Sequence, residues 1–291
     1  MDVYPSLSSC SVPPLPTPRH YHTTFLTSDP RPSIATCGGS KKIPGENFQE
    51  KSCVVLDKVN NRWDAERMGD LTMPRYKSAV ASLDSLGVFI IGGSDPNSKW
   101  KSEFLAAGTS QWQQGPDLPV EMREPCAVVI SPTSFLAIFE KEIHEFDAWS
   151  SGPTNNDGWK KETWPLLKNM RNTWAGCAKL DQKVIITGGW DGSKSAVSTE
   201  VLDLVSRQVT SAGDMAVGRR AFHLATLKRG ALEKVLAIGG ITGGWPQTQT
   251  HDTVEEWVDA DVTWRQTDRM TEGRAYFGEL VVEKDLLCSG W

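Results

Sequence analysis

Six arginines recur along this 291-residue chain at intervals of 48 to 56 residues, each 12 to 17 residues ahead of the start of an apolar run. Four of these runs end in a double glycine: ATCGGS at 35–40, IIGGS at 90–94, IITGGW at 185–190 and LAIGGI at 236–241. Degenerate copies, FLAIFE near Phe135 and LLCSGW near Leu286, occupy the other two positions. A period of this length indicates a repeat architecture in which neighbouring units pack on one another. The arginines are Arg19, Arg75, Arg123, Arg171, Arg219 and Arg274.

Each repeat continues with a polar loop, a short β-like run with an acidic residue, and a tryptophan. Val209 takes the place of the tryptophan in the fourth repeat, and the others are Trp63, Trp112, Trp159 and Trp264. The pattern predicts four short strands per repeat, separated by turn residues, with no helical period. A single sheet of this size cannot bury both of its faces, so we expect an all-β fold in which the sheets pack radially as a β-propeller.

The double glycine after an apolar strand, the Pro-Arg type of turn and the downstream tryptophan resemble Kelch repeats over the whole chain. The resemblance implies one six-bladed propeller with four-stranded antiparallel blades. The last repeat holds only two strands, so we expect the N-terminal segment to complete it and close the ring, which removes exposed sheet edges. The predicted blades are 19–73, 74–121, 122–169, 170–217, 218–273, and 274–291 together with 1–18.

A strand that runs into glycines also begins a dinucleotide-binding loop. Such a loop would occur once and precede a helix, whereas this motif occurs four times and precedes another strand. We therefore interpret the glycines as positions that need positive φ and a close approach of neighbouring backbone.

Composition excludes several classes of function. The net charge is −5 and there is no polybasic run, which argues against nucleic-acid binding. No apolar stretch approaches the roughly 20 residues of a spanning helix, and the N-terminus does not read as a signal peptide, so a cytoplasmic location is expected. Six scattered cysteines without a CxxC pair favour a reduced protein, although Cys37 and Cys53 could face each other across a hairpin in an oxidised, extracellular form.

Catalysis is not expected. His20 and His22 have no carboxylate or cysteine at ligand spacing, and His22 recurs in register as His223, which favours packing. The signatures of copper-radical and sialidase-type propellers are absent from the sequence, so neither a metal nor a cofactor is predicted. The repeat arginines are expected to serve mostly the hydrogen bonding of their own blades, rather than an anion-binding ring, and the repeat tryptophans to pack between blades.

Residues after each arginine and after each glycine pair vary, and the family resemblance places both positions at one mouth of the ring, where partners bind. Tryptophans in the loops around that mouth have no core to fill and are typical of interface hot spots. The predicted partner-binding residues are His20, Ser40, Tyr76, Ser94, Trp100, Asn172, Trp190, Arg220, Trp245 and Trp291.

These residues predict a monomeric protein-interaction module that binds a peptide or loop of a partner, including an acidic one, for substrate recruitment or scaffolding. The resemblance implies a link to ubiquitin ligases or to actin, but the chain holds no BTB or BACK domain. The alternative is an enzyme or small-ligand binder that uses the central channel. Buried ionisable groups with shifted pKa values at the mouth would favour that alternative, and aromatics with exposed arginines would favour the interaction module.

Overall fold

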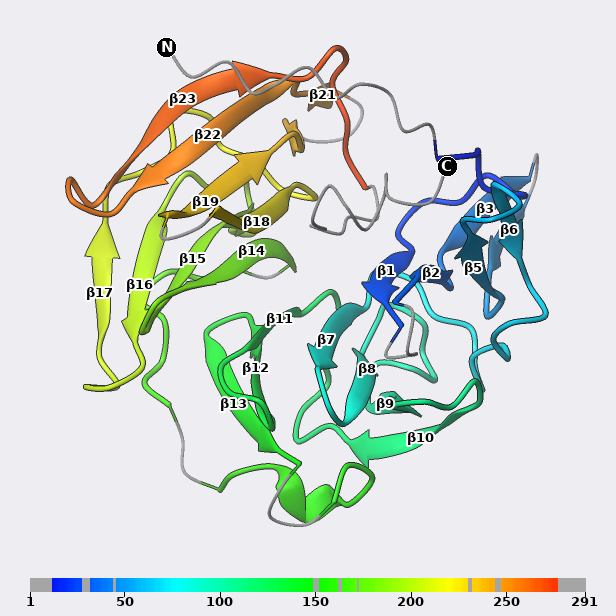
Figure 1. Cartoon of the computed structure of the whole chain (residues 1–291). Coiled ribbons are helices and arrows are strands. Elements are labelled where there is room, and N and C mark those ends of the chain that lie inside the picture. Colours follow the sequence, from blue (N-terminus) through cyan, green and yellow to red (C-terminus); the bar gives the residue numbers. More distant parts are fainter. Residues whose placement is uncertain are drawn as a thin grey trace.

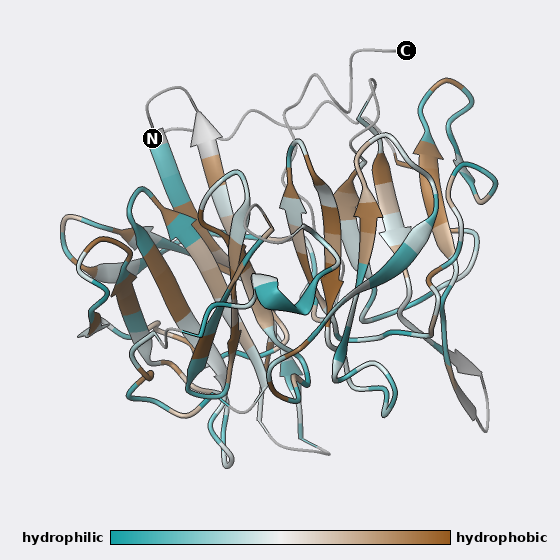
Figure 2. Cartoon of the chain, turned by 90° about the horizontal axis from the view of Figure 1, so that it is seen from below, coloured by the Kyte–Doolittle hydropathy of each residue, from teal (hydrophilic) through white to brown (hydrophobic). Residues whose placement is uncertain are grey.

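The chain folds as a β-propeller of small antiparallel sheets around a common centre (Figure 1). The computed structural model describes residues 12–27, 32–43, 46–148, 152–161, 164–171, 173–229, 232–243 and 247–276. Figure 2 shows that hydrophobic residues concentrate on the strands and hydrophilic residues on the connecting loops.

Five blades are present in the described residues. Blade 1 contains β1 (Thr23–Leu26), β2 (Ile34–Cys37), β5 (Cys53–Asp57) and β6 (Arg62–Asp64). Blade 2 contains β7 (Ala79–Leu83), β8 (Gly87–Ile91), β9 (Lys101–Ala106) and β10 (Trp112–Asp117). Blade 3 contains β11 (Cys126–Val129), β12 (Ser134–Phe139) and β13 (Glu142–Asp147). Blade 4 contains β14 (Thr173–Leu180), β15 (Lys183–Trp190), β16 (Thr199–Asp203) and β17 (Val209–Ala212). Blade 5 contains β18 (His223–Arg229), β19 (Leu232–Ile238), β22 (Thr253–Val258) and β23 (Thr263–Arg269).

Shorter elements decorate this ring. Blade 1 carries a hairpin of β3 (Ser40–Ile43) and β4 (Glu46–Gln49), and blade 5 carries a hairpin of β20 (Ile241–Thr242) and β21 (Gln249–Thr250). Both hairpins follow a glycine pair and therefore lie at the same end of the ring. In the described part of the chain, the 3-10 turn η1 (Asn156–Gly158) is the only helical element, as the missing helical period predicts.

The first strand of each blade lines the centre. Strand β1 contacts β7, β7 contacts β11, β11 contacts β14, and β14 contacts β18. The prediction of radially packed antiparallel sheets is confirmed. The sequence predicts six blades, whereas five are described, because the strands predicted for the sixth, within 274–291 and 1–18, lie almost entirely outside the described residues.

Within the described residues, the hydrophobic core is divided into four clusters, each between two consecutive blades. Alternation along a strand explains this division, because successive side chains point to opposite faces of a sheet. In β8, Ile90 packs towards blade 1, whereas Phe89 and Ile91 pack towards blade 3. Trp112 packs edge-on against Phe25 of the preceding blade at a centroid distance of 5.8 Å, which confirms the predicted inter-blade role.

The glycine pairs lie where one blade meets the next. Gly38 has a φ of +68°, and a Cβ atom there would lie only 2.5 Å from the carbonyl oxygen of Arg75 in blade 2. The next glycine, Gly39, donates a backbone hydrogen bond of 2.7 Å to the same oxygen. The structural interpretation of the glycines is therefore confirmed. Equivalent bonds run from Gly93 to Met122, from Gly189 to Arg219 and from Gly240 to Arg274.

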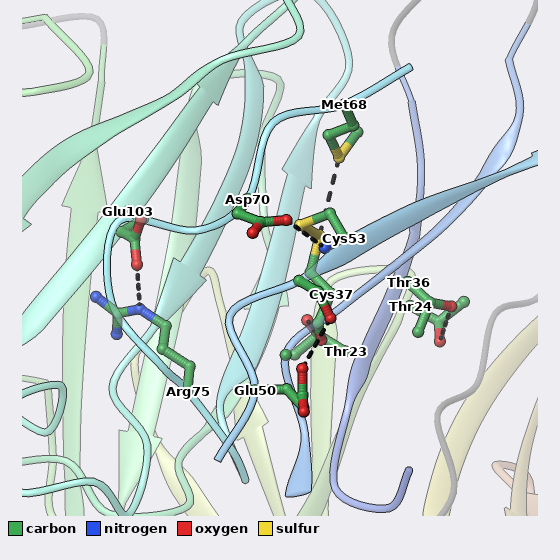
Figure 3. Close-up of a disulfide and its surroundings, with 12 residues drawn as sticks. Thr23, Thr24, Thr36, Cys37, Glu50, Cys53, Met68, Asp70, Arg75 and Glu103 are labelled. Atoms are coloured by element: carbon green, nitrogen blue, oxygen red, sulfur yellow. Dashed lines mark hydrogen bonds and ion pairs between the residues drawn. A yellow bond between two sulfur atoms is a disulfide. The ribbon is translucent and has the colours of Figure 1, made fainter. Parts of the chain in front are cut away.

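Three repeat arginines are buried inside their own blades, in an arrangement that we call the arginine clasp. Arg75 donates to the carbonyl oxygen of Gly92 at 2.9 Å and pairs with Glu103 at 2.7 Å (Figure 3). Both side chains are at most 1% exposed, so the charges neutralise each other where water is absent. The other two clasps are Arg171 with Gly188 and Glu200, and Arg219 with Gly239 and Glu255. These arginines serve their own blades, as predicted, and offer no charge to a ligand.

Blade 3 has no clasp. Phe139 and Glu140 replace the glycine pair, and His144 stands in the register position of the glutamate, opposite Ala137. Arg123 is 57% exposed and pairs with Glu121. The third repeat therefore lacks both the glycine pair and the glutamate counter-charge of the clasps.

Four cysteines form disulfides, contrary to the expectation of reduced cysteines. Cys37 and Cys53 lie directly opposite each other on β2 and β5, which is the hairpin pairing that the sequence left open (Figure 3). Cys126 and Cys177 join β11 to β14. The spacing of cysteines carries no signal for this second bond, because it depends on the packing of two blades. Cys10 and Cys288 lie outside the described residues.

Candidate functional site

A ring of backbone with positive φ surrounds the centre of the propeller at the end where the glycine pairs lie. It contains six of the ten described non-glycine residues with φ between +51° and +60°, a conformation that costs L-residues energy and that gathers at functional sites. Each belongs to a different repeat and lies one to three residues after the repeat arginine. We call this set the mouth ring: Tyr21, Lys77, Glu124, Trp174, Ala221 and Tyr276.

Backbone hydrogen bonds connect part of the mouth ring. The Tyr276 amide donates to the carbonyl of Ala221, the Tyr21 amide to that of Tyr276, and the Lys77 amide to that of Tyr21, at 3.0–3.1 Å. Residues from the two ends of the described chain thereby become neighbours. Tyr276 lies between blade 5 and blade 1.

The ammonium group of Lys77 is enclosed by aromatic rings. Its Nζ lies 4.8 Å from the ring centroid of Tyr21, 5.6 Å from that of Tyr76 and 4.5 Å from that of Trp174. These distances are within the range of cation–π attraction. Glu124 pairs with Lys77 at 2.5 Å and also accepts a hydrogen bond from Ser94 at 2.9 Å. Blades 1 to 4 and Tyr276, which packs on Tyr21, thus meet around one cation.

Arg220 is the second cation of the mouth. Its guanidinium lies 4.5 Å from the ring centroid of Trp190 and donates to Ser195 Oγ at 2.6 Å. The side chain is buried, yet no carboxylate pairs with it among the described residues, in contrast to the three clasp arginines. Among the described residues, Lys77 and Arg220 bring two positive charges to the mouth and Glu124 brings one negative charge.

Burial changes the acid–base behaviour of several mouth residues. Desolvation raises the pKa values of the Tyr21, Tyr76 and Tyr276 phenols, so all three are neutral near physiological pH. Desolvation also lowers the pKa of His22 to about 4, helped by the positive charge of Arg19. The imidazole is therefore neutral near pH 7.

The structure brings most of the described partner-binding candidates together. Tyr76 and Ser94 lie at the Lys77–Glu124 pair, and Trp190 stacks on Arg220. The residue after the arginine hydrogen-bonds through its backbone to the residue after the glycine pair in three blades: His20 with Ser40, Tyr76 with Ser94, and Arg220 with Ile241.

Other candidates stand apart from this network. Ser40 is almost fully buried and presents little surface. Trp100 is 45% exposed in the loop between β8 and β9, and no ring contact of this residue is found in the described part of the chain. Asn172, Trp245 and Trp291 lie outside the described residues.

None of the six mouth-ring residues was among the predicted partner-binding residues. The prediction selected the residue directly after the arginine in four repeats, whereas positive φ falls on the following position in four repeats. Tyrosine at this second position in repeats one and six was a usable signal, because buried aromatic residues with a polar tip are frequent at interfaces.

The described residues contain no group of three or more His, Cys, Asp or Glu side chains that could hold a metal ion. Within the same residues, no helix is sufficiently long and apolar to span a lipid bilayer.

Comparison with known proteins gives no family for this chain. Neither protein-family models nor curated proteins match the sequence.

Proposed function

We propose that the chain is a non-catalytic protein-interaction module that binds a peptide or loop of a partner at the mouth ring. The observation that carries the proposal is the convergence of Lys77, Arg220 and five aromatic side chains from four repeats at one end of the ring. Aromatic and arginine side chains dominate the energetics of protein interfaces. The uncompensated charge of Arg220 favours a partner that supplies a carboxylate.

Shifted pKa values at the mouth are the sign that the sequence analysis set for the alternative of an enzyme or small-ligand binder, but their direction does not suit general acid–base catalysis. A general acid or base works best with a pKa near the operating pH, whereas burial moves the three phenols further above it. Lys77 and Glu124 are already paired with each other.

Comparative affinity capture tests the proposal. Wild type, a Trp190→Ala, Arg220→Ala double variant and a Trp190→Ala single variant are compared, because Arg220 is buried and its loss can affect stability. Val59→Ala is the matched control, since Val59 is an exposed apolar residue in the β5–β6 turn, at the opposite end of blade 1. We expect wild type and control to retain the same proteins, and both Trp190 variants to lose them at least tenfold. Equal capture by all four folded proteins would overturn the mouth as the binding surface.

A second candidate function, binding of a small polar ligand in the channel, is favoured by three atoms. Glu124 Oε2, Trp174 Nε1 and Arg220 Nε are buried and have no hydrogen-bond partner among the residues that the structure describes, whereas buried polar atoms usually have one. Native mass spectrometry of the purified protein would detect a bound ligand as an added mass. That mass should disappear in a Glu124→Gln, Trp174→Phe variant if the channel holds the ligand.

A six-bladed ring of the Kelch type, with one blade shared by the two ends, is part of this proposal. Tyr276 lies between blades 5 and 1, and Gly240 donates to Arg274 as earlier glycines donate to the next blade. Trp63 donates from Nε1 to the Pro13 carbonyl at 2.8 Å. Since each described repeat tryptophan packs on the preceding blade, this bond favours the N-terminal segment as the blade before blade 1.

Location also belongs to the proposal. A cytoplasmic location stays a prediction, and the two disulfides favour an oxidising compartment instead. Links to ubiquitin ligases or to actin rest on the family resemblance alone.

A further inference from the structure

Neighbouring blades are joined by a recurring backbone hydrogen bond, with one exception. The second glycine of a repeat, or its equivalent, donates to a carbonyl at the repeat arginine of the next blade. This bond is present between blades 1 and 2, between blades 2 and 3, between blades 4 and 5, and from blade 5 to Arg274. Between blades 3 and 4, no backbone hydrogen bond runs from Phe139 or Glu140 to the carbonyl groups of Met170 or Arg171, all of which are described.

The same blade also lacks its arginine clasp, so its own loop between the second and third strands is not held by a buried ion pair. Arg123 points to solvent, and the positions of the glycines and the glutamate carry Phe139, Glu140 and His144. A buried Arg–Glu pair fixes the loop between the second and third strands in blades 2, 4 and 5. Blade 3 must hold its place in the ring by other means.

A disulfide spans this junction. Cys126 lies on β11 and Cys177 on β14, which are the first and innermost strands of blades 3 and 4. Their Cα atoms are 6.0 Å apart, within the usual range for a disulfide. Both side chains belong to the hydrophobic cluster between these blades. In the described residues this is the only disulfide that joins two blades, because Cys37 and Cys53 belong to one sheet.

We propose that the Cys126–Cys177 disulfide replaces the missing backbone bond between blades 3 and 4, so that the cohesion of these two blades depends on the redox state of the disulfide. Its formation passes two electrons from the two thiolates to the disulfide of an exchange partner, which becomes a dithiol. Reduction by a dithiol reagent returns two electrons and two protons, and it leaves Cys126 and Cys177 as thiols. The proposal is independent of what the mouth binds.

The Cys37–Cys53 disulfide serves as the internal comparison. It crosses two adjacent strands that already share ladder hydrogen bonds, in a blade whose glycine pair bonds to the next blade. Its loss should therefore change blade 1 locally and leave the blade 3–blade 4 junction closed.

Hydrogen exchange of the folded protein, before and after reduction, tests the inference. Wild type is compared with a Cys126→Ser, Cys177→Ser variant and a Cys37→Ser, Cys53→Ser variant, each with and without dithiothreitol. We expect reduction of wild type to raise exchange in β11 and β14 at least tenfold and to lower Tm by about 5–10 °C. The Cys126/Cys177 variant should show the same exchange without reductant and no further response in these strands. The Cys37/Cys53 variant should respond in β11 and β14 like wild type.

Two measurements on the wild-type protein keep the test decisive if a variant fails to fold. They are peptide mapping without reduction, and hydrogen exchange after reduction. Free thiols at Cys126 and Cys177 in the native protein would overturn the inference. Unchanged exchange of β11 and β14 in reduced wild type, with the bond shown to be broken, would overturn it as well. A response of equal size in the Cys37–Cys53 strands and in β11 and β14 would show general loosening and would also contradict it.

Discussion

At the scale of single residues, Gly38 is constrained in two ways. Its backbone has positive φ, and the carbonyl of the next blade occupies the space that a side chain would need. Gly108 has a similar φ of +73° but nothing within 4 Å of its missing Cβ. The two glycines therefore separate the cost of the backbone conformation from the cost of blade contact.

Replacing each glycine by alanine should reveal that difference. We expect Gly108→Ala to lower the free energy of unfolding by about 1 kcal/mol, the cost of a left-handed backbone. Gly38→Ala should lower it by about 2 kcal/mol more, because backbone atoms must shift to relieve the overlap. Urea unfolding followed by tryptophan fluorescence measures both, and equal losses would contradict the role of Gly38 in blade contact.

His22 makes stability depend on pH. Its folded pKa of about 4 lies below the ordinary 6.5, so the unfolded chain binds more protons between these values. The contribution is complete above pH 6.5 and declines as the pH falls towards 4, by at most about 3 kcal/mol. A His22→Asn variant should lose less stability than wild type between pH 7 and pH 4.5 in thermal unfolding. Parallel profiles would show that His22 is not responsible.

At the scale of elements, the clasp ties a loop to its own blade through one buried ion pair. Arg75→Ala leaves the carboxylate of Glu103 buried and uncompensated, which should cost about 3–5 kcal/mol of stability. Arg123→Ala is the matched control in the next repeat, because Arg123 is largely exposed, and its loss should stay within about 0.5 kcal/mol. Denaturant unfolding of the two variants compares them directly. Similar losses would mean that burial of the pair is not what stabilises the blade.

The sequence predicted these elements well where their causes are local. Strand periodicity, glycine pairs and repeat tryptophans follow from the alternation and turn geometry of each unit, so four-stranded blades could be expected. The prediction holds for blades 1, 2, 4 and 5, whereas blade 3 has three strands in the described residues. The acidic partners of the arginines were not predicted, since each lies 28 to 36 residues away along the chain. They are Glu103, Glu200 and Glu255. The role of Lys77 was not predicted for a similar reason. Two of its aromatic neighbours, Tyr21 and Trp174, come from other blades, and only closure of the ring brings them together.

At the scale of the whole molecule, the ring depends on contacts between residues that are distant in sequence. The Tyr21 carbonyl accepts a hydrogen bond from the Lys77 amide, and the Tyr21 amide donates one to the Tyr276 carbonyl. These two bonds join the first, second and last repeats at the mouth. On the outer side of blade 1, Trp63 Nε1 donates a hydrogen bond to the carbonyl of Pro13, which is also distant in sequence. An interrupted ring would expose the edges of its terminal sheets and the apolar faces that blades bury in each other.

Deletion of residues 1–16 tests closure by the N-terminal segment. The truncated chain loses the Trp63–Pro13 bond and, under the six-bladed proposal, part of a blade. We expect a Tm lower by more than about 10 °C, or association into oligomers through the open edges, measured by calorimetry and light scattering. Trp63→Phe removes only the one hydrogen bond, so this control should stay monomeric and lose a few degrees at most. A truncated protein that is monomeric with an unchanged Tm would contradict closure by this segment, because a shared blade cannot lose its N-terminal strands without cost.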